Sequence, residues 1–253
     1  MKKIFLSIIK ILTVVYLLVS IFIFIKQRDF LYFPTYQIKH NFTEESFIND
    51  GITIKTTIIN KGNKNLIIYF GGNGENVDYN ADIFAKIFPT NTIYLIKYRG
   101  YSGSMGIATE KNLYSDALYI YDKIKPQYNK ISVIGRSLGS GIATYLASKR
   151  EINRLVLVTP FDSIESIAQE IFPFLPISLL LRDKYKSIER VKFIKSKTLV
   201  IQAENDQIVG EEHTKRLVNK FHCSQIIFKE IKNSNHNDIS DNKYYYKLLQ
   251  QFI

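Results

Sequence analysis

A G-x-S-x-G pentapeptide at residues 135–139 constrains the fold of this chain more than any other part of its sequence. The apolar run 131–134 precedes it, and residues 140–149 follow it with the pattern of a helix. Strand, tight turn and helix in this order are typical of a nucleophile elbow, in which a strained turn lifts the serine Oγ above the sheet. Glycine is needed at both ends of the turn because a Cβ atom would collide with the neighbouring strand or helix. We therefore expect Ser137 to be a nucleophile; the alternative is a glycine-rich turn that happens to contain serine.

Short apolar runs and stretches of helical periodicity alternate along the rest of the chain. The apolar runs have no internal polar alternation, which predicts an α/β fold with a mostly parallel central sheet covered by helices on both faces. Strands are expected at 66–70, 92–96, 131–134, 155–158, 198–201 and 226–231, and helices at 77–87, 109–124, 140–149, 211–221 and 241–252. Residues 52–59 alternate instead and predict an antiparallel edge strand. In such a sheet the site lies beyond the carboxyl ends of the strands.

The segment from residue 4 to residue 25 is almost continuously apolar. As a helix it spans about 30 Å of hydrocarbon, and its one internal charge, Lys10, lies near the start, where the side chain can snorkel. Phe22, Ile23, Phe24 and Ile25 stand where a signal peptidase needs small residues, so we expect an uncleaved anchor rather than a signal peptide. The N-terminal tail before the run is very short and would stay cytoplasmic, which places the remainder of the chain on the non-cytoplasmic side.

These features divide the chain into a transmembrane anchor at 4–25, a juxtamembrane segment at 26–50 and a catalytic domain at 51–253, with a short cap insertion at 160–197.

The formal net charge is +11, and the basic residues are scattered along the chain without a nucleic-acid motif. We therefore expect a solvated surface that favours anionic lipid and no nucleic-acid partner. The single cysteine, Cys223, excludes an internal disulfide and a cysteine metal site. Neither a metal nor an organic cofactor is expected.

A serine nucleophile needs a base in contact with it and a carboxylate that orients the base. His236 lies in a polar loop directly after the last predicted strand, which is where the base belongs when the chain order is serine, acid, histidine. The other three histidines lie outside such a loop. His40 precedes the sheet, His213 lies within a predicted helix, and His222 lies near the end of that helix; we expect the last two on the surface.

Two carboxylates follow the penultimate predicted strand, and we favour Asp206 over Glu204 as the orienting acid. Asp206 lies further into the loop, and its shorter side chain suits a fixed contact with the histidine. The tetrahedral intermediate also needs backbone N–H donors. Leu138, directly after the nucleophile, is expected to supply one; the glycine-rich loop after the early strand supplies the other through Asn73 or Gly74, between which the sequence does not decide.

Four stretches carry a family resemblance: 27–34, 70–76, 98–104, and the elbow together with the Asp206 and His236 loops. They resemble the juxtamembrane signature, the H-G-N-A-x-N oxyanion loop, the D-Y-R-G-Y-G-x-S segment and the triad of membrane-anchored α/β hydrolases in the Bem46 and ABHD13/ABHD17 group, whose domain is also named serine aminopeptidase. The chain departs from that pattern at Gly71, where the family has histidine, and at Lys97, where it has an acid. The resemblance implies the α/β-hydrolase fold.

The resemblance implies many hydrolytic roles, including deacylation of lipids and of acylated proteins, and the fold does not select among them. Because the domain is anchored and its cap is apolar, we expect a membrane-anchored serine hydrolase that cleaves acyl esters or thioesters of a lipid, lysolipid or acylated substrate through an acyl-enzyme. The apolar stretch 171–181 in the cap is expected to wall an acyl pocket or to dip into the membrane surface, and ordinary cap packing is the alternative. Two other functions stay open: a serine peptidase that uses the same three residues, and a non-catalytic membrane scaffold that keeps the fold.

Overall fold

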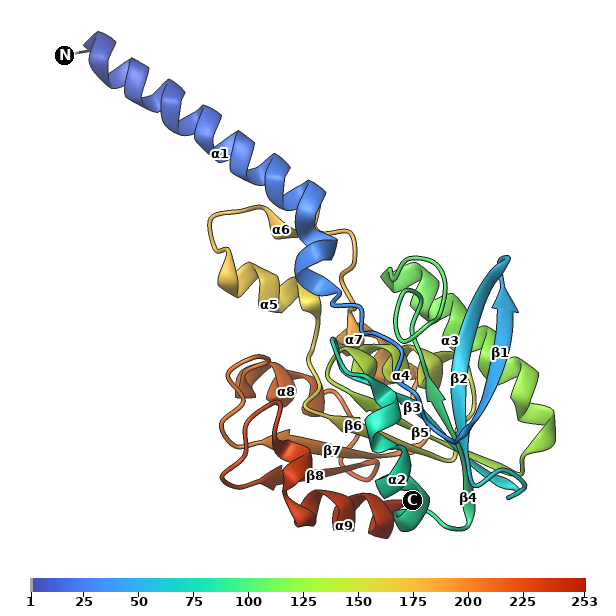
Figure 1. The fold of residues 1–253 in the computed structure, drawn as a ribbon. Coiled ribbons are helices and arrows are strands. Elements are labelled where there is room, and N and C mark those ends of the chain that lie inside the picture. The colour runs from blue at the N-terminus through green and yellow to red at the C-terminus, as the bar shows by residue number, and fades with distance from the viewer. Residues whose placement is uncertain (1) are drawn as a thin grey trace.

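The computed structural model describes residues 2–253 and contains a central eight-stranded sheet with helices on both faces (Figure 1). The strands are β1 Thr43–Asn49, β2 Ile52–Ile59, β3 Asn65–Phe70, β4 Asn91–Ile96, β5 Lys130–Arg136, β6 Arg154–Val158, β7 Lys197–Ala203 and β8 Ile226–Ile231. Their order in the sheet is β1-β2-β4-β3-β5-β6-β7-β8. Strand β2 runs antiparallel to both neighbours, whereas all the other pairings are parallel.

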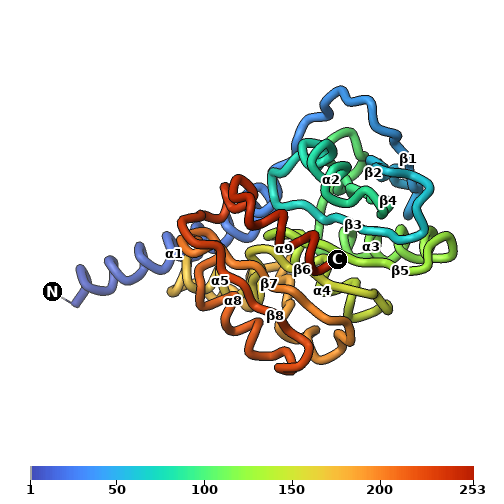
Figure 2. The backbone as a smooth tube through the Cα atoms, turned by 90° about the horizontal axis from the view of Figure 1, so that it is seen from below, coloured from blue at the N-terminus to red at the C-terminus, as the bar shows by residue number. Residues whose placement is uncertain are grey.

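The helices mostly fill the connections between successive strands. They are α1 Lys2–Leu31, α2 Ala81–Ile87, α3 Glu110–Ile124, α4 Leu138–Lys149, α5 Ile164–Ile171, α6 Ile177–Leu180, α7 Ser187–Arg190, α8 Glu211–Val218 and α9 Lys243–Phe252. Helices α5, α6 and α7 form the cap between β6 and β7. Helix α1 leaves the globular part beside α5 and projects away from it, as both views show (Figures 1 and 2). Within residues 2–253, α1 is the one helix long and apolar enough to cross a membrane.

Alternating side chains of the strands enter two cores on opposite faces of the sheet. Leu66, Ile68 and Phe70 of β3 pack with α3 and α4 on one face, whereas Ile67 and Tyr69 pack with α2 and α9 on the other. Because both faces are buried, a central strand of this sheet is apolar at most positions. This is why the apolar runs without polar alternation mark the parallel strands correctly.

Most of the predicted elements are confirmed, with ends that differ by a few residues. Thr109 caps α3, since its side chain accepts a hydrogen bond of 3.1 Å from the backbone N–H of Asn112. The prediction that residues 52–59 form the edge of the sheet is wrong. They form β2, an antiparallel strand, but β1 covers its outer side and takes the edge. In β1 only Phe47 and Asn49 are buried, so the strand has almost no apolar pattern to detect.

Lys97, one of the two residues that depart from the family pattern, lies directly after β4 and forms a buried ion pair. The side chain of Lys97 is fully buried, and its Nζ lies 2.9 Å from Oδ2 of Asp78. The contact between these two atoms is an ion pair without the alignment of a hydrogen bond. Lys97 also bonds to the carboxylate of Glu44 on β1, and Oδ1 of Asp78 accepts a 2.6 Å hydrogen bond from Thr57 on β2. A lysine at this position therefore has its counter-charge inside the fold.

Replacing Lys97 by methionine should cost about 3–5 kcal/mol in the free energy of unfolding, because the carboxylate of Asp78 stays buried without its cation. Lys55→Met is the matched control. Its Nζ lies 3.7 Å from Glu44 and is partly exposed, so its loss should cost about 1 kcal/mol or less. Urea unfolding of the detergent-solubilised full chain measures both, and equal small losses would contradict the structural weight given to the Lys97 pair.

Candidate active site

Ser137 lies at a sharp turn between the end of β5 and the start of α4. Its φ is 48°, a left-handed conformation that is strained for a residue with a side chain. A Cβ atom on Gly139 would overlap the carbonyl of Phe70 in β3, and one on Gly135 would overlap the carbonyl of Gly139. Only glycine at both positions lets α4 lie this close to the strands. The turn therefore has the geometry expected of a nucleophile elbow.

His236 lies between Ser137 and Asp206 and contacts both. Its Nε2 atom is 2.8 Å from Oγ of Ser137, and its Nδ1 atom is 2.8 Å from Oδ2 of Asp206. Asp206 follows β7 and His236 follows β8, so both loops lie at the carboxyl ends of the strands, as Ser137 does. The structure thus brings together the three residues that the sequence nominates, although they come from three separate loops.

The loop that carries Asp206 fixes its carboxylate. Oδ1 accepts hydrogen bonds from the backbone N–H groups of Ile208, at 3.0 Å, and Val209, at 2.9 Å, which leaves Oδ2 for His236. Burial alone would raise the pKa of Asp206, but the hydrogen bonds from His236 and from these two N–H groups outweigh it and hold the pKa below its usual value. At neutral pH the group next to His236 is therefore a carboxylate.

The competing carboxylate, Glu204, has other partners. It accepts hydrogen bonds of 2.8 Å from the backbone N–H of Asn233 and from Nζ of Lys232. These contacts tie the end of β7 to the loop after β8 and do not involve His236. The preference for Asp206 as the partner of the histidine therefore agrees with the geometry.

The loop after β3 approaches Ser137 closely. A Cβ atom on Gly72 would lie 3.6 Å from Cβ of Ser137. The backbone N–H of Gly72 donates a 2.6 Å hydrogen bond to the carboxylate of Glu75, which also accepts 2.7 Å hydrogen bonds from Tyr69 and Asn80. Sequence reasoning missed this role of Glu75, since a single acid in a glycine-rich loop gives no pattern that could reveal it.

The next residue of this loop, Asn73, is held by its side chain. Its Oδ1 accepts 2.9 Å hydrogen bonds from the backbone N–H of Phe33 and from the hydroxyl of Tyr101. Within residues 2–253, neither the N–H of Asn73 nor the N–H of Gly74 donates a hydrogen bond to another backbone group. Neither of the two candidate donors is therefore used by another backbone group, and the loop that presents them is fixed by the segment that follows α1.

Two hollows of different chemistry meet at Ser137. One, of about 320 Å³, is almost wholly apolar and lies between α1, the cap and the serine. Its lining residues are Ile23, Gln27, Phe30, Leu31, Phe33, Asn73, Ser137, Leu138, Phe161, Ile164, Ile167, Ala168, Ile171, Phe172, Ile177, Leu181, Ile208 and Val209. The other, of about 200 Å³, is polar and is lined by Gly72, Asn73, Gly74, Glu75, Arg136, Ser137, His236 and Asn237. Ser137 and Asn73 line both hollows.

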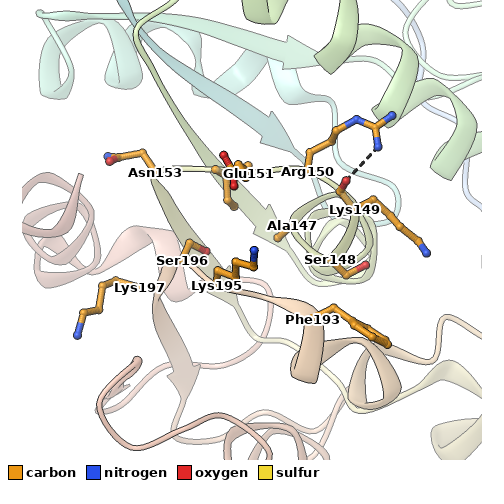
Figure 3. Close-up of a pocket in the computed structure, with 11 residues that line it drawn as sticks. Ala147, Ser148, Lys149, Arg150, Glu151, Asn153, Phe193, Lys195, Ser196 and Lys197 are labelled. Carbon is orange, nitrogen blue, oxygen red and sulfur yellow. Dashed lines mark hydrogen bonds between the residues drawn. The ribbon is translucent and has the colours of Figure 1, made fainter.

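A third hollow, of about 460 Å³, lies at the opposite ends of the parallel strands (Figure 3). It is bounded by the end of α4, by Asn153 just before β6 and by Ser196 just before β7. Those are the amino ends of parallel strands, whereas Ser137, Asp206 and His236 lie at the carboxyl ends. Charged side chains such as Lys149 and Lys195 surround it (Figure 3). This hollow is therefore separate from the candidate active site.

The expectation that His213 lies on the surface is wrong, whereas His222 is exposed as expected. His213 is buried, with Nδ1 2.7 Å from Oδ1 of Asp162 and Nε2 3.2 Å from Glu170 of α5. Asp162 also accepts a 2.6 Å hydrogen bond from Arg216. The helix that carries His213 packs against the segment after β6, and the buried partner that stabilises the histidine is distant in sequence.

No family model matches the chain. An uncharacterized protein of Mycobacterium tuberculosis is 36% identical over 131 residues, which cover 50% of this chain and 47% of that protein. The lysophosphatidylserine lipase ABHD12 of Gallus gallus is 29% identical over 178 residues, 61% of this chain and 46% of the relative. The Bem46 protein of Schizosaccharomyces pombe is 26% identical over 199 residues, 74% of this chain and 66% of that protein. The chain spans about half the length of the first curated relatives it matches.

Among solved structures, the esterase Pf2001 of Pyrococcus furiosus superposes with a TM-score of 0.66. The match covers 87% of this chain and 98% of the esterase at 16% sequence identity. A likeness at that identity shows that the two proteins share a fold and leaves the activity to be argued from the site.

Proposed function

The chain belongs to the α/β-hydrolase superfamily, and on that relationship and the geometry of the site we propose that it is a membrane-anchored serine hydrolase acting on acyl esters or thioesters. The observation that carries the proposal is the pair of 2.8 Å contacts that link Ser137, His236 and Asp206 at the floor of an apolar cavity. The proposed steps use no metal and no organic cofactor.

Acylation starts at Ser137. Asp206 accepts the Nδ1–H of His236, which leaves Nε2 unprotonated and able to accept the serine proton. The electron pair of Oγ attacks the carbonyl carbon of the ester while Nε2 takes the proton. His236 then returns that proton to the leaving alcohol or thiol as the carbon–oxygen or carbon–sulfur bond breaks. Water then attacks the acyl carbon while the same histidine takes its proton. The bond between the acyl group and Oγ breaks, and His236 returns the proton to Ser137.

Two backbone N–H groups are proposed to hold the oxyanion. Leu138 is the first residue of α4, where the unpaired N–H groups and the helix dipole favour negative charge. For the second donor we favour Asn73 over Gly74, because Asn73 lines both hollows beside Ser137 and Gly74 lines only the polar one of the two. The hydrogen bonds to the Asn73 side chain fix this donor before substrate arrives.

We propose that the two hollows receive different halves of the substrate. The apolar cavity suits the acyl chain, and the polar hollow suits the alcohol or thiol that leaves. A peptidase that recognises free amino termini would need an acid free to bind the amine, but Glu75 in the polar hollow is already held by Gly72, Tyr69 and Asn80. The relative named lysophosphatidylserine lipase supports an acyl lipid as substrate.

Removing the proposed nucleophile tests the function. With an acyl ester presented to the full chain in detergent, Ser137→Ala should lower kcat about 10⁴-fold or more, and Asp206→Asn about 10³–10⁴-fold. Glu204→Gln is the matched control, because Glu204 bonds to the neighbouring loop and not to His236. It should keep activity close to that of the wild type.

The same assay separates the alternatives. Faster cleavage of an aminoacyl anilide than of acyl esters would favour a peptidase on the same residues. A folded wild-type protein that cleaves neither substrate would refute the hydrolase proposal and favour a scaffold. A Ser137→Ala variant with full turnover would refute the assignment of Ser137 as the nucleophile.

We also propose that α1 anchors the protein as a single-pass helix, with the hydrolase domain on the non-cytoplasmic side. The exposed Cys223 is the only cysteine in the sequence and can report this orientation. In spheroplasts of a bacterial host, a membrane-impermeant maleimide should label the wild type and not Cys223→Ser. Labelling that requires lysis of the spheroplasts would place the domain in the cytoplasm.

A further inference from the structure

We propose that α1 forms a wall of the acyl-chain site in addition to anchoring the protein, and that a bilayer lipid enters this site sideways between α1 and the cap helices α5 and α6. The proposal rests on the proposed hydrolase function, because it takes the apolar cavity above Ser137 as the place of the substrate's acyl chain. It adds the route of entry and the residues that select chain length.

One stripe of α1 faces the cavity. Ile23, Gln27, Phe30 and Leu31 line it, and their spacing of i, i+4, i+7 and i+8 puts them on one side of a helix. The cap helices supply the facing wall, and Ser137 lies at the floor. Ile23 belongs to the apolar run expected in the membrane, so the cavity extends from the nucleophile to the membrane-spanning segment.

Polar contacts clamp α1 to the cap. The buried side chain of Gln27 donates a 3.1 Å hydrogen bond to the carbonyl of Leu180 and accepts a 2.6 Å hydrogen bond from the backbone N–H of Arg182. On the next residue, Arg28 pairs with Asp183 at 2.8 Å. A flexible tether needs no such contacts, whereas buried and satisfied polar groups fix one orientation of the helix. The wall that α1 forms is therefore part of the folded domain.

The cap reaches into the depth of the membrane-spanning segment. The hydroxyl of Tyr16 donates a 3.1 Å hydrogen bond to the carbonyl of Phe174, in the loop between α5 and α6. Ile25 ends the apolar run nine residues after Tyr16, which is about 13 Å along a helix. Large apolar side chains in this part of the cap are exposed, with Phe174 of the loop 88% and Leu179 of α6 81% exposed. Such side chains are stable in hydrocarbon and costly in water.

The rim of the cavity lies next to this loop. Ile171 ends α5 and Phe172 begins the loop that reaches Tyr16, and both residues line the cavity and remain partly exposed. An opening at this place faces the hydrocarbon rather than water. An acyl chain can then pass from the bilayer to Ser137 without exposing its apolar surface to water. A volume of about 320 Å³ is at the lower end of ligand cavities and suits one acyl chain rather than two.

Chain-length preference tests the wall. The full chain is reconstituted in phospholipid vesicles, and kcat/KM is measured for p-nitrophenyl acetate and p-nitrophenyl laurate. In Ile23→Trp the indole occupies part of the cavity, so the ratio of laurate to acetate kcat/KM should fall about tenfold or more. Ile25→Trp is the matched control, because Ile25 lies on the opposite side of α1 and is 64% exposed; it should keep the wild-type ratio. An unchanged ratio in Ile23→Trp, or an equal fall in both variants, overturns the proposal.

A second measurement does not depend on turnover. Ser137→Ala protein in the same vesicles is irradiated with a lysophospholipid that carries a diazirine in its acyl chain, and the crosslinked residues are identified by mass spectrometry. Crosslinks to Ile167 and Ala168, inside the cavity on α5, are expected. Crosslinks confined to the outer face of α1 would overturn the acyl site even where esters are hydrolysed. Crosslinks inside the cavity of a protein whose wild type cleaves no ester would support the acyl site and refute the hydrolase function instead.

Discussion

The close approach of α4 to strands β3 and β5 is the constraint on which the candidate active site depends. Gly135 and Gly139 permit it, and the resulting turn holds Ser137 in a conformation that a residue with a side chain rarely adopts. The turn raises the serine above the sheet, and it places the N–H of Leu138 at the start of a helix beside it. His236 and Asp206 then need only rigid loops at the ends of neighbouring strands, which a parallel sheet provides.

The sequence could predict the parallel strands because burial on both faces leaves a simple apolar pattern. It could not predict β1, whose inward-facing Phe47 and Asn49 are too few to form one. The meeting of Ser137, His236 and Asp206 was predictable from the chain order and from the loops in which these residues occur. The burial of His213 was not, since its partner Asp162 follows a different strand and only the tertiary packing brings the two together. The relationship to the Bem46 protein, expected from short motifs, is confirmed.

Both residues that depart from the family pattern are accommodated by their neighbours in the fold. A Cβ atom on Gly71 would lie 2.6 Å from Cγ1 of Val77, so a larger residue there would require a shift of the loop. Lys97 meets the buried carboxylate of Asp78, so the changed charge is matched. Neither Gly71 nor Lys97 lines the hollows at Ser137, and the departures leave the proposed chemistry in place.

Contacts between α1 and the cap join two parts of the chain that sequence reasoning treats as separate. Gln27 interrupts the apolar character of α1, and only the structure shows that its partners are backbone groups at Leu180 and Arg182. Periodicity describes a helix and its faces, but it does not say what a face packs against. The structure is therefore continuous across the domain boundary expected after residue 25, from α1 to the cavity above Ser137.

The central claim is that His236 and Asp206 activate Ser137 at the floor of this cavity. The most direct measurement is the reaction of the detergent-solubilised full chain with an alkyl fluorophosphonate, followed by identification of the modified residue by peptide mass spectrometry. We expect the phosphonyl group on Ser137 in the wild type, and no modification of a folded His236→Ala variant at the same reaction time. A folded wild type that stays unmodified, modification at another residue, or equal modification in His236→Ala would contradict the claim.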